Sequence, residues 1–269
     1  MILRTIDAAL AAELTALVAR AATAILAISP ADMATRLKAD HTPVTAADAA
    51  ADRVIAQGLA RLLPGLPIVS EEGRARAGAA LTETFALVDP LDGTKEFVAG
   101  RGEYTVNLAI VTDGAPIAGF IAVPALGLLY RGIVASGAER LGLDPAIAPT
   151  AIRCRRAPAH GLVAAVSRSH LDPESEAFLA RLPISERITC GSALKLCRIA
   201  EGVADVYPRL GPTSEWDLAA GHAIVAAAGG IVTTPPGAPV RYGRAERDFK
   251  IPGFVAWGDP TRQIDPVPA

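Results

Sequence analysis

Residues 85–97, FALVDPLDGTKEF, constrain the fold more than any other segment, because an apolar run ends abruptly in two aspartates, a proline and a glycine. Such a run, bounded by turn residues, predicts a buried strand followed by a tight turn. Asp89 and Asp92 are three residues apart, whereas aspartyl-nucleophile phosphatases place them two apart, at the position that Pro90 occupies here. Pro90 and Leu91 also interrupt the alternating oxygen ligands of an EF-hand loop. The spacing therefore excludes both motifs.

Four further acidic residues share this structural context. They are Glu71 and Glu72, which follow the apolar run PIVS, and Asp217 and Asp48, which lie in the first turns of two predicted helices. Ligands of α/β proteins collect beyond the carboxyl ends of strands and at helix N-termini, where backbone N–H groups are free. Each acid alone is equally explained by a solvated turn or a helix terminus. Together with the aspartates of the turn, they predict a crevice that Mg²⁺ or Mn²⁺ would hold together.

The composition limits the class of protein. A chain of 269 residues, 51% of them hydrophobic, can bury one large core or two smaller ones, and a formal net charge of −2 argues against a general nucleic-acid-binding surface. The three cysteines contain no CxxC pair, which predicts a reducing compartment and a cytoplasmic protein. Asp7, Glu13 and Arg20 interrupt the apolar N-terminal stretch, so we expect no integral membrane segment, although peripheral association with a membrane stays open.

The first half of the chain predicts two long helices followed by strands. Amphipathic helices are expected over residues 6–28 and from Thr45, the predicted N-cap, to Pro64. The two apolar runs before the acidic turns predict buried strands, and residues 104–135 predict a meander of three strands.

The second half alternates strands with helices, which indicates an α/β layer. The segments GLVAAVS, ADVYPR and GFVAWG predict strands, and DPESEAFLARL, SALKLCRIAEG and WDLAAGHAIVAAAGG predict helices. Residues 136–160 are rich in Pro, Ala and Arg and show little periodicity, so we place a domain boundary there. We expect an N-terminal α+β domain over residues 1–145 and a C-terminal α/β domain over residues 146–269.

Several segments resemble the signature of one enzyme superfamily. VSEEG, LVDPLDGTKEF and EWDLAAGHAIVAAAGG are similar to the lithium-sensitive, magnesium-dependent phosphomonoesterases, which include inositol monophosphatase, fructose-1,6-bisphosphatase and 3'(2'),5'-bisphosphate nucleotidase. KADHTPVTAAD, GEYTVNLAIV, VSRSH and GSALKLCRIAEGVADVYPRLGPTSEWD resemble the bacterial nucleotidase branch, the CysQ type. Inositol phosphatases more often have Thr-Asn where Lys95-Glu96 stands. The resemblance spans residues 38–230 and implies a layered αβαβα sandwich of the inositol monophosphatase-like type.

Carried over residue by residue, the resemblance implies a site. The implied metal ligands are the side chains of Glu71, Asp89, Asp92 and Asp217 and the backbone carbonyl of Leu91; Glu72 is not carried over as a ligand. Thr94 and Asp48 are implied to orient and deprotonate an attacking water, with no phosphoenzyme. The implied substrate contacts are Glu71, Leu91, Asp92, Gly93, Thr94, His170, Ser192, Lys195, Arg209 and Asp217, with Ser192 and Lys195 facing a second phosphate.

The resemblance implies Mg²⁺-dependent hydrolysis of the 3'-phosphate of adenosine 3',5'-bisphosphate to AMP and phosphate, with 3'-phosphoadenylyl sulfate as a further substrate and a role in sulfate assimilation. It implies two or three Mg²⁺ ions, replacement by Mn²⁺ and inhibition by Li⁺. The partner is a small nucleotide, not a nucleic-acid polymer, and the chain is expected to be a monomer or homodimer.

Two alternatives stay open. A phosphatase for inositol or sugar phosphates is disfavoured by GTKEF and SALKLC. A non-catalytic sensor of phosphate ligands would be favoured by loss of Thr94, Asp48 or a ligand acid, and all of these residues are present.

Overall fold

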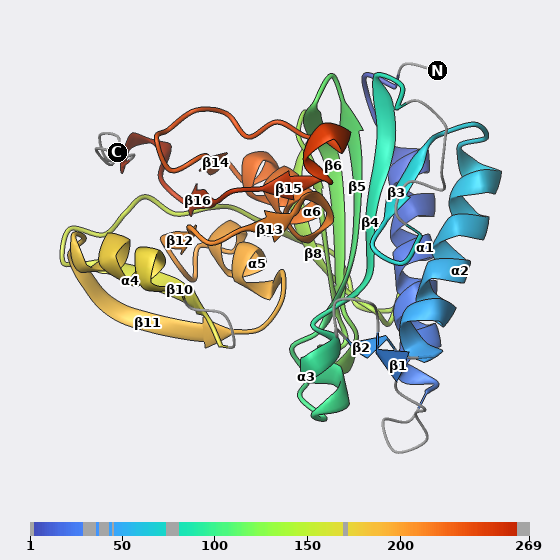
Figure 1. The fold of residues 1–269 in the computed structure, drawn as a ribbon, viewed down its shortest axis with the longest axis horizontal. Coiled ribbons are helices and arrows are strands. Elements are labelled where there is room, and N and C mark those ends of the chain that lie inside the picture. Colours follow the sequence, from blue (N-terminus) through green and yellow to red (C-terminus); the bar gives the residue numbers. More distant parts are fainter. Residues whose placement is uncertain are drawn as a thin grey trace.

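The structure is a computed structural model that describes residues 3–28, 36–37, 43–44, 46–73, 81–168 and 172–262. Figure 1 shows two sheets separated and flanked by helices.

The first part of the chain forms a seven-stranded sheet with two helices on one face (Figure 1). The helices are α1 (Ala8–Leu26) and α2 (Ala46–Leu62). In spatial order the strands are β3 (Ile68–Ser70), β4 (Thr84–Asp92), β5 (Thr105–Thr112), β6 (Ala115–Val123), β7 (Leu128–Ile133), β8 (Gly137–Gly142) and β9 (Thr150–Ile152). Strands β3 and β4 run parallel, and the other neighbouring strands run antiparallel. Short elements are α3 (Thr94–Val98), the 3₁₀ helix η2 (Pro124–Leu126), and the paired β1 (Arg36–Leu37) and β2 (Pro43–Val44).

The second part forms a five-stranded mixed sheet. In spatial order its strands are β11 (Ile184–Cys190), β10 (Leu162–Ser167), β12 (Val206–Arg209), β16 (Phe254–Trp257) and β14 (Ile231–Thr233). Its helices are α4 (Pro173–Ala180), α5 (Leu194–Ala200) and α6 (Glu215–Ala227). Strand β13 (Thr213–Ser214) pairs with β15 (Lys250–Ile251), and η3 (Ala245–Arg247) and η4 (Pro260–Arg262) are single 3₁₀ turns.

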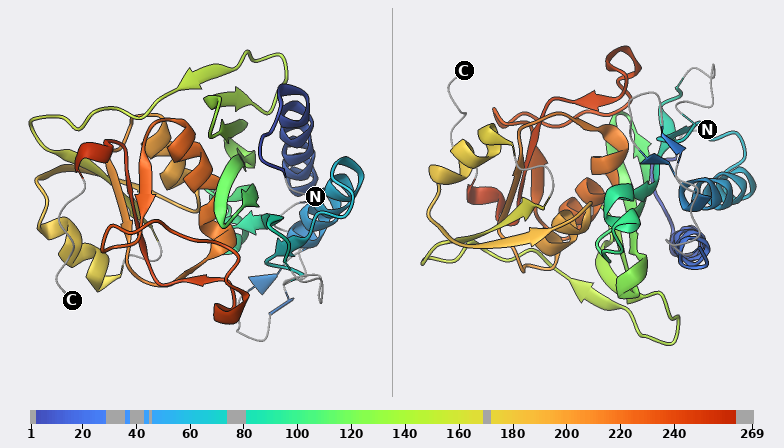
Figure 2. Two further views of the ribbon diagram at one scale, coloured as in Figure 1. Left: turned by 90° about the horizontal axis from the view of Figure 1, so that it is seen from above. Right: turned by 60° about the horizontal axis from the view of Figure 1, so that its bottom comes forward.

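These elements stack in five layers, which Figure 2 shows from two further directions. One apolar core lies between the first sheet and the pair α1 and α2, and a second fills the space between the two sheets around α5 and α6. A third core joins the second sheet to α4, where Phe178 packs against Trp257. The predicted αβαβα sandwich is therefore confirmed.

Helix α1 is the one described helix that is long and apolar enough to cross a membrane. Its residues Leu14, Leu17 and Val18 are fully buried and belong to the core that α1 shares with α2 and the first sheet. Such packing is typical of a core helix in a globular protein.

Several strands were not predicted individually, among them β8, β9 and β11. Strands β8 and β9 lie in the segment that shows little periodicity, and β11 precedes the helix of the GSALK segment. Strands β9 and β11 are the outer strands of their sheets, and most side chains of β11 are exposed or only partly buried. An edge strand has fewer buried positions, so its apolar alternation is weak. The division of the chain near residue 145 stays a prediction.

Helix α6 approaches the first sheet at two glycines. A Cβ atom on Gly119 of β6 would overlap the carbonyl oxygen of Ala220, and one on Gly132 of β7 would lie 2.5 Å from the Cα of Ile224. Because the obstructing atoms belong to the backbone of α6, they cannot move independently of the helix. These two glycines therefore fix how closely α6, with Asp217 in its first turn, lies against the sheet.

We expect Gly119→Ala to lower the free energy of unfolding by about 1–3 kcal/mol, because an inserted methyl group forces a backbone shift in a packed core. Urea unfolding monitored by circular dichroism measures the change. Gly258→Ala is the matched control, since the nearest atom to its added Cβ is the Arg155 carbonyl oxygen at an ordinary 3.5 Å. Equal stability of the two variants would show that α6 does not pack this closely.

Candidate active site

The turn after β4 presents a backbone carbonyl beside two carboxylates. The pairing of β4 with β5 is irregular between Asp89 and Asp92, so the two residues between them leave the ladder. Asp89 Oδ1 accepts a hydrogen bond of 3.1 Å from the Leu91 N–H. Gly93 follows with φ +89°, a left-handed conformation that favours glycine, and Thr94 begins α3. The Thr94 hydroxyl lies 3.2 Å from the Leu91 carbonyl oxygen, which places that oxygen at the same turn.

Two further acids reach this turn from other elements. Glu71 directly follows β3, and its N–H donates to the Val88 carbonyl on the neighbouring β4 at 3.1 Å. Asp217 is fixed by a capping box in the first turn of α6: its Oδ2 accepts from the Thr213 hydroxyl at 2.6 Å and from the Ser214 N–H at 3.1 Å. The same contacts that cap α6 therefore set the direction of the Asp217 carboxylate.

One pocket collects most of the predicted site residues. Its walls include Glu71, Asp89, Leu91, Asp92, Gly93, Thr94, Ser192, Lys195, Arg209 and Asp217. Asp48 adjoins it, because Asp48 Oδ1 accepts a hydrogen bond of 3.2 Å from the Thr94 hydroxyl. Glu72 lies instead in a separate hollow beside α2. His170 lies outside the described residues, so its role stays a prediction.

The carboxylates in this pocket repel one another in a buried setting. Burial raises the pKa of Asp89 well above its usual value, and the charges of Glu71, Asp92 and Asp217 raise it further. Burial and the Asp217 charge raise the pKa of Asp92 to about 7, although Lys195 and Arg209 act in the opposite direction. Shifts of this kind mark negative charges that the protein alone does not neutralise.

The donor set fits a hard divalent cation. Three aspartates, two glutamates and Leu91 line the pocket, and carboxylate and carbonyl oxygens are the ligands that Mg²⁺ and Mn²⁺ prefer. Across the described ranges, no group of three or more His, Cys, Asp or Glu side chains is already drawn together at metal-binding spacing. The acids of the described residues therefore line one pocket without forming a closed cage.

Two of the three cationic side chains that line this pocket, Lys195 and Arg209, act on its carboxylates. Lys195 of α5 is only 2% exposed; its Nζ donates to the Ser192 carbonyl at 2.7 Å and lies 5.2 Å from the centre of the Tyr207 ring. Burial opposes the charge on Arg209, but Tyr207, Asp217 and Asp92 outweigh this effect and raise the pKa of Arg209. Both groups therefore place positive charge beside the carboxylates.

Sequence reasoning did not identify the aromatic wall of the pocket. Tyr207 and Phe254 both line it, and their rings meet edge-to-face at 5.2 Å. Tyr207 has a usable signal in the sequence, because it lies two residues before Arg209 on the same strand and so shares its face. Phe254 has none, because it reaches the site only through the pairing of β16 with β12.

We expect Asp92→Asn to gain stability relative to the wild type as pH rises, when both proteins are free of metal. A carboxyl whose folded-state pKa is raised to about 7 contributes stability below its unfolded pKa and loses it as pH rises through 7. From about pH 4 to about pH 8 the variant should gain about 2–4 kcal/mol relative to the wild type.

The comparison between variant and wild type is necessary because His222 has the opposite slope. Burial lowers its pKa to about 4, so the stability that depends on His222 is lost as pH falls below its unfolded pKa of about 6.5. Urea unfolding with a chelator measures both proteins. A difference that does not change with pH would contradict the assigned environment of Asp92.

The comparisons with known proteins agree with this geometry. The model of the Inositol monophosphatase family matches residues 4–256. The 3'(2'),5'-bisphosphate nucleotidase CysQ of Escherichia coli strain K12 is 42% identical over 219 residues, which cover 81% of this chain and 86% of the relative. CysQ of Buchnera aphidicola is 40% identical over 223 residues, covering 81% of this chain and 82% of the relative.

Solved structures also resemble this chain over most of its length. CysQ from Bacteroides thetaiotaomicron, described as a bacterial member of the inositol monophosphatase family, superposes with a TM-score of 0.75 at 36% identity and covers 92% of this chain and 96% of its own. The suhB protein of Bartonella henselae shares the fold with a TM-score of 0.76 at 24% identity, covering 95% and 96%. Because the family model and these relatives match most of its length, the chain belongs to the inositol monophosphatase family.

Proposed function

We propose that the protein is a Mg²⁺-dependent 3'(2'),5'-bisphosphate nucleotidase that removes the 3'-phosphate of adenosine 3',5'-bisphosphate, and of 3'-phosphoadenylyl sulfate, by direct attack of water. The observation that carries the proposal is that one pocket is lined by Glu71, Asp89, Leu91, Asp92, Lys195, Arg209 and Asp217. The similarity to proteins named as nucleotidases over four fifths of the chain supports the same substrate class.

The carboxylate end of the pocket is suited to the transferred phosphoryl group. The inositol monophosphatase family consists of metal-dependent phosphatases that generally use Mg²⁺. Glu71, Asp89, Asp92, Asp217 and the Leu91 carbonyl would hold the metal, which supplies charge neutralisation, an activated water and a clamp on the attacking and leaving oxygens. Gly93 and Thr94 would offer backbone N–H groups to the phosphate at the start of α3.

Thr94 and Asp48 form a path for the proton of the attacking water. The Thr94 hydroxyl lies 3.2 Å from Asp48 Oδ1, so the hydroxyl can donate to the carboxylate while its lone pair accepts a hydrogen bond from water. As the water oxygen attacks phosphorus, its proton passes toward Asp48, the bond from phosphorus to the ribose 3'-oxygen breaks, and the leaving oxygen takes a proton from water to become the 3'-hydroxyl. Asp48 is 1% exposed, which keeps this path away from bulk solvent.

The cationic side chains of the pocket are suited to a second phosphate. Lys195, Arg209 and the Ser192 hydroxyl share one pocket with the metal-ligating acids, as a ligand with phosphates at both ends requires. A monophosphate ester of a neutral sugar has no second anionic group to place beside Lys195 and Arg209. The arrangement therefore favours the bisphosphate nucleotide over inositol 1-phosphate.

The similarity to the inositol monophosphatase family supports the finer properties that we propose. Two or three Mg²⁺ ions take part, Mn²⁺ replaces them, and Li⁺ inhibits by occupying one of their positions. The enzyme acts in the cytoplasm as a monomer or homodimer, with an N-terminal domain to residue 145 that carries most metal ligands and a C-terminal domain that completes the site. The three cysteines are free, which agrees with a reducing compartment.

The test is phosphate release by the purified protein with Mg²⁺, comparing adenosine 3',5'-bisphosphate, inositol 1-phosphate and fructose 1,6-bisphosphate. Preference for the nucleotide supports the proposal. Preference for inositol 1-phosphate or fructose 1,6-bisphosphate keeps the metal chemistry and overturns the substrate. No release with Mg²⁺ or Mn²⁺ from any of the three would favour the non-catalytic sensor.

Replacing Lys195 should remove the preference for a second phosphate. We expect Lys195→Met to lower kcat/KM for adenosine 3',5'-bisphosphate about 10- to 100-fold and to affect adenosine 3'-monophosphate far less, because a charge-assisted contact is worth about 1.5–3 kcal/mol. Steady-state kinetics on both nucleotides gives the ratio directly. An equal loss on both would place Lys195 in support of the fold rather than in contact with the second phosphate.

A further inference from the structure

Glu103 joins the two parts of the chain at the edge of the pocket. Its Oε2 accepts a hydrogen bond from the Gly191 N–H at 2.9 Å and one from Arg168 Nε at 3.0 Å. Its Oε1 accepts from Arg168 Nη2 at 3.0 Å, and the same Nη2 donates to the Thr189 carbonyl at 3.3 Å. A carboxylate that lies before β5 is thus bonded to the ends of both β10 and β11. We call these contacts the Glu103 clamp.

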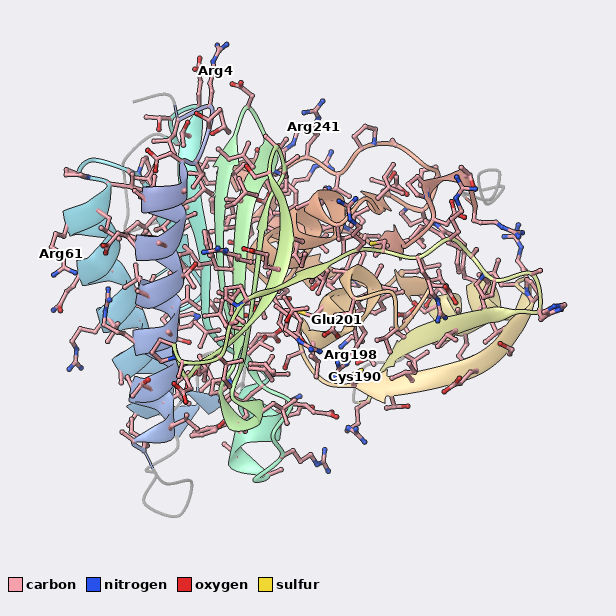
Figure 3. All side chains as sticks on the ribbon, turned by 180° about the vertical axis from the view of Figure 1, so that it is seen from behind. Arg4, Arg61, Cys190, Arg198, Glu201 and Arg241 are labelled. Carbon is pink, nitrogen blue, oxygen red and sulfur yellow. The ribbon has the colours of Figure 1, made fainter. Side chains whose placement is uncertain are left out.

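The segment that the clamp holds is tightly constrained. A Cβ atom on Gly191 would lie 2.7 Å from the Glu103 carbonyl oxygen, so the two backbones meet without room for a side chain. Ser192, the next residue, has φ +48°, an unfavourable left-handed conformation for a residue other than glycine. Figure 3 labels Cys190, which precedes them, at the carboxyl end of β11. The left-handed conformation of Ser192 persists only where surrounding contacts enforce it.

The strained segment contacts the turn that carries the proposed chemistry. The Ser192 hydroxyl donates to the Asp92 carbonyl at 2.9 Å, and a Cβ on Gly93 would overlap that hydroxyl. The Ser192 carbonyl in turn accepts from Lys195 Nζ at 2.7 Å. Ser192 therefore links the Asp92–Gly93 turn to Lys195, and the position of Ser192 depends on Gly191.

We infer that Glu103 is a positioning residue for the hydrolytic reaction: by holding Gly191, it fixes the wall formed by Ser192 and Lys195 against the Asp92–Gly93 turn. This inference rests on the proposed function. Burial would raise the pKa of Glu103, but hydrogen bonds from Arg168 and Gly191 lower it, so the carboxylate stays charged at neutral pH. Arg168 acts one step further away, because it holds Glu103 and the end of β11 together.

Four variants separate this role from ordinary stabilisation. Glu103→Ala removes the clamp, Glu103→Gln keeps an oxygen that can accept from Gly191, and Arg168→Met removes only the guanidinium. Glu176→Ala is the matched control, because Glu176 forms an ion pair of similar exposure with Arg187 away from the pocket. The readouts are kcat and KM on adenosine 3',5'-bisphosphate and adenosine 3'-monophosphate, and hydrogen exchange of the residues 190–192 amides without substrate or metal.

The expected pattern is graded. Glu103→Ala lowers kcat about 10- to 100-fold on both nucleotides, since misplacing bound groups by about 1 Å costs this much. It also speeds exchange of the Gly191 amide, whose hydrogen-bond acceptor is lost. Glu103→Gln recovers most of the kcat, Arg168→Met gives an intermediate loss, and Glu176→Ala behaves as the wild type. This recovery by the uncharged isostere is what a positioning role requires.

Several results would overturn the inference. Faster Gly191 exchange in Glu103→Ala with unchanged kcat would make the clamp purely structural. If Glu103→Ala does not fold, an Arg168→Met variant with wild-type kcat decides against the role. A wild type that hydrolyses neither nucleotide overturns the proposed function and the positioning role together. An active wild type with an equally active, folded Glu103→Ala variant overturns the positioning role alone.

Discussion

Asp89→Asn is expected to lower kcat/KM for the preferred substrate at least about 1000-fold, because it removes a charge that stabilises the transition state through the metal. The same substitution should raise the free energy of unfolding of the metal-free protein wherever the wild-type carboxyl is ionised. Burial and three neighbouring acids raise the pKa of Asp89, so its ionised form destabilises the fold when no cation is bound. Activity and stability thus change in opposite directions.

Asp205→Asn is the matched contrast to this variant. Asp205 is 2% exposed, close to the 1% of Asp89, but its carboxylate is compensated by two hydrogen bonds of 2.8 Å from Arg155 and by the Val163 N–H at 2.7 Å. Removing this charge should lower stability, because it leaves Arg155 without its partner. Phosphate release and urea unfolding, each with and without Mg²⁺, measure the two variants. An Asp89→Asn protein that keeps its activity, or that is less stable than the wild type without metal, contradicts the assigned site.

The acidic part of the site could be predicted because each acid follows a local signal. Asp89 and Asp92 end an apolar run, and Asp217 lies in the first turn of a helix, so a sequence pattern places each at a strand or helix terminus. Such termini converge in layered α/β proteins, and the structure brings these residues to one pocket. Their common location therefore follows from the order of elements without knowledge of any side-chain contact.

The rest of the site depends on strand register and burial, which local patterns do not contain. Phe254 lies opposite Arg209 in the pairing of β12 with β16, although 44 positions separate them in the chain. Lys195 resembles any exposed helical lysine in the sequence, yet the structure buries it against Tyr207. Glu103 meets Gly191 only because the two sheets face each other. Edge strand β11 was not predicted, because most of its side chains are exposed or partly buried and its apolar alternation is therefore weak.

Asp48→Asn and Thr94→Ala are each expected to lower kcat about 100- to 10,000-fold, the range for loss of a general base and its relay. Neither residue is among the expected metal ligands, so the stabilisation of the protein by added Mg²⁺ should be kept in both variants. Mg²⁺-dependent shifts in melting temperature, measured beside kcat, separate this loss from the loss in Asp89→Asn.

The two residues should act as one unit, because the Thr94 hydroxyl lies within hydrogen-bond distance of Asp48. The double variant should therefore be little slower than the slower single variant, since groups that act in one proton path are not additive. Thr94→Ser keeps a hydroxyl and should recover most of the activity, whereas Thr94→Val, which keeps the shape but not the hydroxyl, should not. If the losses of the two single variants multiply in the double variant, or if Thr94→Val is active, the proton of the attacking water leaves by another route.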